Sequence, residues 1–71
     1  MRRRFEFVEG TSNKFYEVTV AGNQVSVTFG RIGTAGQTQN KSFPDPIAAQ
    51  QHADKLIQQK LAKGYTELAV A

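Results

Sequence analysis

Apolar and polar residues alternate along three stretches in the first 30 positions, and this pattern of period 2 predicts β-strands. The strands are expected at residues 4–9, where Phe5 and Phe7 share one face, at residues 15–20 and at residues 25–29. Gly22 and Asn23 separate the last two stretches and suit a two-residue hairpin turn, because both residues tolerate a positive φ angle. The polar segment 37–43 predicts a fourth strand at an edge of the sheet.

A turn at Gly22 and Asn23 also determines which residues of the two strands lie opposite one another. One face of the hairpin is then apolar and the other polar, as expected for a sheet that is covered on one side. The predicted cross-strand pairs are Val20 with Val25, Val18 with Val27, Tyr16 with Phe29, Phe15 with Gly30, and Lys14 with Arg31.

The apolar period changes after residue 45, and the new spacing predicts an amphipathic helix from about Pro46 to about Lys63. Asp45 can cap its first turn, Pro46 fits position N1, and Gly64 can end it. The apolar stripe of this helix consists of Ala49, Ala53, Leu56, Ile57 and Leu61 and is expected to pack on the sheet. Leu56→Ala should therefore destabilise the fold by roughly 2 to 5 kcal/mol if Leu56 is fully buried.

The predicted elements indicate an α+β fold, a small antiparallel sheet of about four strands with one amphipathic helix packed on one face. Residues 65–71 are expected to form a short extended tail. A chain of 71 residues is long enough for a single domain, here residues 1–71, and leaves little interior for a catalytic cleft.

The amino-acid composition and net charge limit the classes of function that this chain could have. The chain has no cysteine, which excludes disulfides and thiolate metal sites, and its net charge of +3 favours a polyanionic partner. Arg2, Arg3 and Arg4 are followed by an alternating segment rather than an apolar one, so no signal peptide is expected. No apolar run is long enough to span a membrane, and a cytoplasmic location is the default expectation.

Three glycines at three-residue spacing, Gly30, Gly33 and Gly36, make residues 29–37 the most unusual stretch. Dinucleotide-binding and P-loop motifs open a helix after a buried parallel strand, whereas this stretch leads into a polar strand. The GXXG loop of KH domains also occurs in a different context. We therefore expect Gly33 and Gly36 to shape a turn, and Gly30 to mark a bulge or a close approach of the backbone.

The stretch Phe29-Gly30-Arg31-Ile32-Gly33-Thr34-Ala35-Gly36-Gln37 resembles the signature of the WGR domain, with Phe29 at the usual tryptophan position. The resemblance extends over residues 14–18, the hairpin, residues 41–43, the helix and residues 63–65, which is nearly the whole chain. WGR domains occur in poly(ADP-ribose) polymerases, where they help to bind DNA breaks, and as short bacterial proteins. In the polymerases the motif tryptophan packs on a sugar at the DNA end, and the motif arginine makes contacts where DNA meets neighbouring domains. The resemblance implies those roles for Phe29 and Arg31.

The residues themselves leave two interpretations of Phe29 open, a core aromatic side chain or an exposed stacking surface. Two like charges, Lys14 and Arg31, are predicted to face each other beside the Tyr16 and Phe29 pair, and they could either separate into water or hold a phosphate. The candidate nucleic-acid-binding residues are Phe29, Arg31, Lys14, Tyr16, Lys41, Arg2 and Arg4.

No enzyme is predicted, because the acidic residues have no spacing suited to acid–base catalysis or metal binding and no histidine is placed to activate a hydroxyl. His52 is expected to have a structural role, and no cofactor, metal or small-molecule substrate is predicted. The first hypothesis is a nucleic-acid-binding module of low sequence specificity, with DNA as the first choice of partner. The alternative is a protein–protein interaction module that docks through its edge strand or loops.

Overall fold

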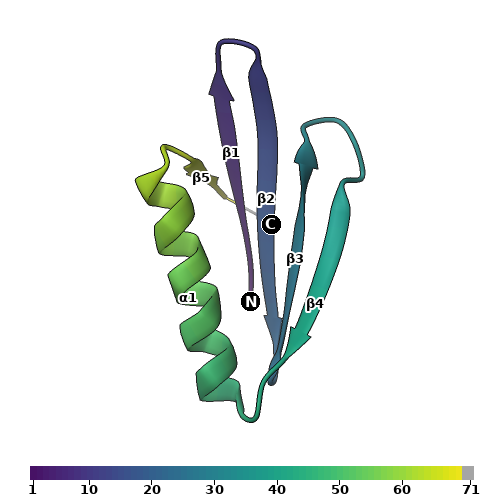
Figure 1. Ribbon diagram of the computed structural model, residues 1–71, viewed down its shortest axis with the longest axis vertical. Coiled ribbons are helices and arrows are strands. Elements are labelled where there is room, and N and C mark those ends of the chain that lie inside the picture. Colours follow the sequence, from purple (N-terminus) through teal and green to yellow (C-terminus); the bar gives the residue numbers. More distant parts are fainter. Residues whose placement is uncertain (70–71) are drawn as a thin grey trace.

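A computed structural model describes residues 1–69, which form one antiparallel sheet and one helix (Figure 1). The strands lie side by side in the order β4-β3-β2-β1-β5. This is the predicted α+β fold, with one strand more than expected. The elements are β1 (Arg2–Glu9), β2 (Ser12–Ala21), β3 (Gln24–Arg31), β4 (Gln37–Ser42), α1 (Pro46–Ala62) and β5 (Thr66–Leu68).

The additional strand β5 comes from the segment that was expected to be an extended tail. It pairs antiparallel with the middle of β1, so that Glu67 lies opposite Phe5. The Arg3 guanidinium donates two hydrogen bonds to the Glu67 carboxylate, each 2.7 Å long. A strand of three residues is too short for an alternating pattern, and these long-range contacts define it instead.

The β2–β3 hairpin has the predicted register in every pair, from Ala21 opposite Gln24 to Lys14 opposite Arg31. The turn differs in one respect, since Gly22 alone takes a positive φ, of 61°. Asn23 instead ties the turn to the connection between β4 and α1. Its side-chain amide donates to the Phe43 carbonyl at 3.0 Å, and its own carbonyl accepts from the Phe43 amide at 2.8 Å.

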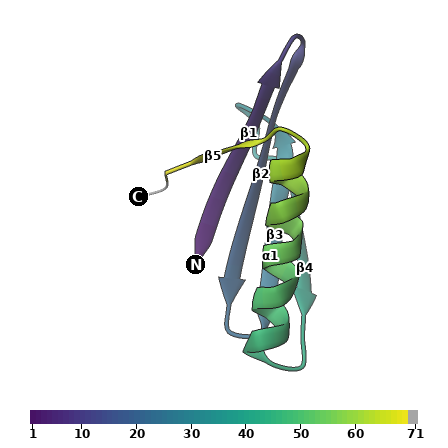
Figure 2. The same ribbon diagram turned by 90° about the vertical axis from the view of Figure 1, so that its left-hand side faces the viewer.

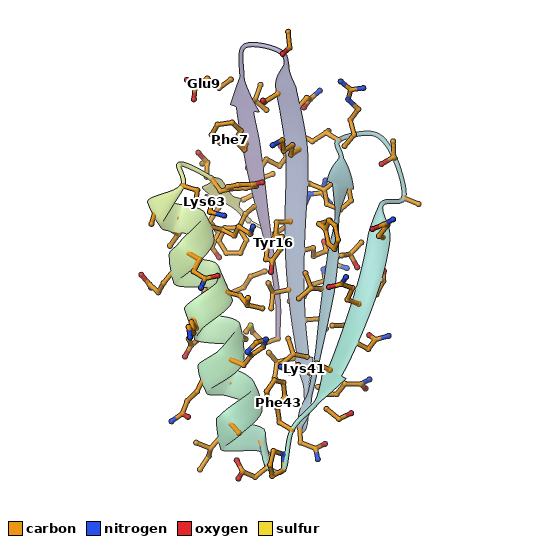
Figure 3. The ribbon with its side chains drawn as sticks, viewed as in Figure 1. Phe7, Glu9, Tyr16, Lys41, Phe43 and Lys63 are labelled. Carbon is orange, nitrogen blue, oxygen red and sulfur yellow. The ribbon has the colours of Figure 1, made fainter. Side chains whose placement is uncertain are left out.

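The helix forms a second layer on one face of the sheet (Figure 2). It packs against β2 and β3 and leaves the predicted edge strand β4 uncovered, with all six residues of β4 exposed. The β1–β2 hairpin extends beyond the C-terminal end of α1, where Phe7 and Lys63 lie, whereas Lys41 and Phe43 lie towards its N-terminal end (Figures 1 and 3). The helix therefore covers only part of this face of the sheet.

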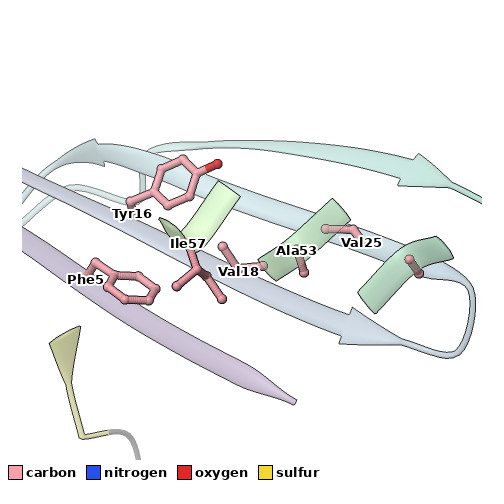
Figure 4. Packing of buried hydrophobic residues seen from close by; sticks show 7 residues of the cluster. Phe5, Tyr16, Val18, Val25, Ala53 and Ile57 are labelled. Atoms are coloured by element: carbon pink, nitrogen blue, oxygen red, sulfur yellow. The ribbon is translucent and has the colours of Figure 1, made fainter. Parts of the chain in front are cut away.

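The core lies between α1 and the first three strands (Figure 4). The buried side chains of this core are Phe5, Tyr16, Val18 and Val25 from the sheet and Ala49, Ala53 and Ile57 from the helix. The Asp45 carboxylate accepts a hydrogen bond from the Ala48 amide at 2.8 Å and so caps the helix as predicted. The predicted apolar stripe was too wide, because Leu56 is only partly buried and Leu61 is 39% exposed. Small alanines at the contact let α1 approach the sheet closely along a narrow line, and larger residues flank that line.

Candidate nucleic-acid interface

The motif loop follows β3 and turns back sharply into β4. Gly33 and Gly36 both have positive φ angles, 94° and 73°, as the predicted turn requires. The Arg31 carbonyl accepts hydrogen bonds from the Thr34 hydroxyl at 2.7 Å and from the Thr34 amide at 3.1 Å. The Ile32 amide donates to the Asn13 carbonyl at 3.0 Å, which ties the loop to β2. The loop that begins at Arg31 is therefore closely held.

Phe15 supports this loop from the face of the sheet that the helix does not cover. It is 4% exposed although no helix covers it, because the backbone at Gly36 and Gly30 lies against its ring. A Cβ atom at Gly36 would lie 2.7 Å from Phe15 Cζ and 2.5 Å from the Phe29 carbonyl oxygen. A Cβ atom at Gly30 would lie 2.8 Å from Gly36 Cα, which confirms the expected close approach of the backbone.

Lys14 and Arg31 lie opposite each other near the loop end of β2 and β3, and both side chains are exposed. Alternation places them on the helix-covered face, in line with Tyr16 and Phe29. Neither cation has an ion-pair partner among residues 1–69. The structure thus brings together four of the predicted site residues, Lys14, Tyr16, Phe29 and Arg31.

The end of α1 adds two lysines and a tyrosine to this cluster. Lys60 Nζ lies 4.5 Å from the centre of the Tyr16 ring and 5.5 Å from the centre of the Tyr65 ring, within the range of cation–π attraction. Burial lowers the pKa of Lys60, and the neighbouring charges of Lys63 and Lys14 lower it further. These three lysines repel one another, and a bound anion would relieve that repulsion.

The cluster encloses two concave spaces that share Lys14, Lys60 and Tyr65, with volumes of about 300 and 340 Å³. Tyr16 and Phe29 line the first, and Phe7 and Lys63 line the second. Burial raises the pKa of Tyr16, so its hydroxyl stays protonated and able to donate. We call this surface, together with Arg31 opposite Lys14, the motif-end site; it consists of Lys14, Tyr16, Phe29, Arg31, Lys60, Lys63 and Tyr65. Figure 3 labels Tyr16 and Lys63.

Phe29 is partly a core side chain and partly an exposed surface, the two interpretations that the sequence left open. It is half-buried, it packs against the core cluster, and its remaining surface lines the concave space beside Lys14 and Lys60. A half-buried ring of this kind can stabilise the fold and still present one side to a ligand.

Lys41 does not join the motif-end site. It lies on the same face of the sheet, but it pairs with Val25, six residues before Arg31 on β3, which places it about 20 Å away along the strand. Its ammonium lies 5.5 Å from the centre of the Phe43 ring. That ring packs in a tilted arrangement against the His52 ring, with 4.8 Å between the two ring centres.

Arg2 and Arg4 also lie outside the motif-end site, on the opposite face of the sheet. Arg4 forms ion pairs with Glu6 at 3.2 Å and Glu17 at 3.7 Å, and Arg2 lies 3.9 Å from Glu17. Arg4 also covers the Phe15 ring, with 4.5 Å between its guanidinium carbon and the ring centre. Within residues 1–69 the three N-terminal arginines are thus balanced by glutamates, and the excess positive charge is carried by the lysines and Arg31.

Sequence reasoning missed Lys60, Lys63 and Tyr65. Both lysines lie at the C-terminal end of the helix, where positive charge interacts favourably with the helix dipole, and that role explains them at the level of the sequence. A usable signal was present, because Lys60 follows the buried Ile57 by three residues and therefore shares its face of the helix. Tyr65 could not be placed before the course of the chain after α1 was known.

Residues 1–69 offer neither a metal-binding cluster nor a membrane-spanning helix. These residues contain no group of three or more histidine, aspartate or glutamate side chains able to hold a metal ion. Their one helix is neither long nor apolar enough to cross a lipid bilayer.

The fold is a small antiparallel sheet that carries one helix, a tightly held glycine-rich loop and an aromatic surface rimmed by cations. The chain belongs to the WGR domain family, since the model of that family, described as WGR domain, matches residues 1–70.

The chain is similar to three bacterial proteins that are much longer. The Escherichia coli protein YehF is 43% identical over 67 residues, which are 94% of this chain and 24% of YehF. The E. coli protein YfeS, described as uncharacterized, is 36% identical over 94% of this chain and 28% of its own length. A crystal structure of a protein from Bacteroides fragilis aligns with a TM-score of 0.94 and 43% identity, over 97% of this chain and 20% of that one. The chain thus spans about a quarter of the two E. coli relatives.

Proposed function

We propose that this WGR domain binds nucleic acid through the motif-end site, with DNA as the first choice of ligand. The observation that carries the proposal is the gathering of Lys14, Lys60 and Lys63 around aromatic rings, with Arg31 directly opposite Lys14 on the neighbouring strand. None of these four cations has a carboxylate partner among residues 1–69. Phosphates provide the charge that such a cluster lacks. The family resemblance supports the same class of ligand.

The four cations would contact phosphates, while the exposed sides of Phe29 and Tyr65 pack on a sugar or a base. We expect little sequence specificity. The proposed contacts are made to phosphates, sugars and ring faces, which carry no direct sequence information, rather than to base edges.

The test is a fluorescence-anisotropy titration of labelled blunt duplex, nicked duplex, single-stranded DNA and RNA, each at two salt concentrations. If binding involves about 3 to 5 phosphates, log affinity falls with log salt at a slope of roughly −3 to −4.5. Absence of micromolar binding to every nucleic acid at low salt would overturn the proposal.

A second candidate function is docking to a protein. Strand β4 pairs on one side only, and its six residues are all polar and exposed, so a partner strand could extend the sheet at this edge. A protein partner whose capture is unaffected by nuclease treatment would favour this alternative over nucleic-acid binding.

A further inference from the structure

A third concave space lies between α1 and the uncovered part of β3 and β4, on the same face of the sheet as the motif-end site. Its volume is about 530 Å³, and it shares Tyr16 and Phe29 with the motif-end site. The two spaces therefore adjoin at the Phe29 ring. We call this one the β4 groove; its lining includes Val27, Phe29, Gln39, Lys41, His52 and Leu56.

The β4 groove has an apolar floor and a polar rim. Val27, Phe29 and Leu56 are apolar side chains that are partly buried against the core and keep exposed surface. Gln39 lies on the rim, is exposed, and makes no side-chain hydrogen bond among residues 1–69. A free amide group carries both donors and an acceptor, as the edge of a nucleobase does.

The β4 groove is lined by positive charge and by no negative charge. Lys41 lies at its far end, and no carboxylate is among the residues that line it. Burial lowers the pKa of His52, and the positive charges of Lys41 and Lys55 lower it further. An occupant of this groove would therefore be anionic and would bring apolar or aromatic surface to the floor.

We propose that the β4 groove holds a single-stranded nucleic-acid segment that continues from the motif-end site. Its unpaired bases lie against Phe29 and Leu56, and a phosphate lies near Lys41. Within a duplex the base faces are stacked inside, whereas an unpaired strand exposes its base faces together with its phosphates and can use both the apolar floor and the cation. This inference rests on the proposed function, since the motif-end site supplies the anchoring contacts.

The first experiment compares a blunt duplex with the same duplex carrying a 5′ or a 3′ single-stranded tail of about four to eight nucleotides. Fluorescence anisotropy at one low salt concentration gives each Kd. We expect a tail of one polarity to bind at least about tenfold more tightly than the blunt duplex, because each stacked base adds to affinity. Equal Kd values for blunt and tailed DNA overturn the groove inference and leave the proposed function standing. If neither DNA binds, the proposed function fails as well.

The second experiment uses two variants with the same change of charge on the same strand. Gln39→Glu places a carboxylate in the β4 groove, whereas Ser42→Glu places one on the other face of β4, opposite Gln24. Gln39→Glu should remove most of the tail advantage and change blunt-duplex affinity less than about twofold. Ser42→Glu should preserve the tail advantage. An equal loss in both variants would show general charge repulsion and would overturn the inference, as would full retention of the tail advantage in Gln39→Glu.

Discussion

Lys14 and Arg31 lie directly opposite each other at the loop end of the β2–β3 hairpin, both exposed and neither in an ion pair within residues 1–69. Like charges in cross-strand positions destabilise a sheet. Lys60 and Lys63 add to the same surface, and nearby acids compensate the N-terminal arginines instead. Uncompensated positive charge is thus concentrated at one end of the sheet, where an anionic ligand would relieve the repulsion between these side chains.

Replacing Arg31 should lower DNA affinity without lowering the stability of the fold. Arg31→Ala removes one member of the like-charge pair, so we expect unfolding free energy to stay the same or rise by about 0.2 to 1 kcal/mol. DNA affinity should fall, and the slope of log affinity against log salt should become shallower by about one. Arg2→Ala is the matched control, because Arg2 lies on the opposite face of the sheet, outside the motif-end site. An unchanged slope in Arg31→Ala would contradict the role of this residue.

The two turn glycines of the motif loop should differ in their tolerance of a side chain. Gly33→Ala meets no atom within 4 Å, so it should cost only the left-handed backbone penalty of about 1 to 2 kcal/mol. Gly36→Ala adds a clash with the Phe29 carbonyl and the Phe15 ring and should cost clearly more, with loss of DNA affinity as the loop moves. Chemical denaturation of both variants measures the difference. Equal losses would mean that Phe15 does not support the loop as described.

The helix should depend on Ile57 more than on Leu56. Ile57 is 2% exposed within the core cluster, so Ile57→Ala should destabilise the protein by about 2 to 5 kcal/mol. Leu56 is only partly buried at the groove, and Leu56→Ala should cost less than Ile57→Ala. Thermal melting and denaturant titration can rank the two variants. The reverse order would show that α1 packs through a different stripe.

Attachment of β5 should depend on pH through Glu67. The hydrogen bonds from Arg3 lower the pKa of Glu67 below its ordinary value of 4.5. The folded state therefore favours the ionised carboxylate, so this contribution to stability is present above pH 4.5 and is lost as pH falls through the lowered pKa. Glu67→Gln should have a lower melting temperature than wild type at neutral pH, and this difference in melting temperature should become smaller in acid. Glu9→Gln is the control, because Glu9 is exposed and has no ion pair among residues 1–69. Its melting temperature should differ little from that of wild type, and this difference should not shrink in acid as it does for Glu67→Gln. A difference for Glu67→Gln that persists in acid would mean that the ion pair does not hold β5.

Local patterns in the sequence determined most of the fold. A period of 2 on each side of Gly22 and Asn23 specifies both the faces and the register of the hairpin, because a slip of one residue would move every apolar side chain to the wrong face. That register placed Lys14 opposite Arg31 and Phe15 against Gly30. The period of the helix, with Asp45 as its cap, likewise predicted α1 almost to the residue, and the motif at residues 29–37 indicated the family.

Only the tertiary structure decided which distant elements meet. The angle and closeness of α1 on the sheet bring Lys60 over Tyr16, leave Leu56 at a groove and keep β4 uncovered. Pairing of β5 with β1 gives Arg3 its partner, and Glu6 and Glu17 neutralise Arg4. Periodicity specifies the face on which a side chain lies, but the neighbours of that face depend on packing between elements far apart in the chain, and no local pattern encodes that packing.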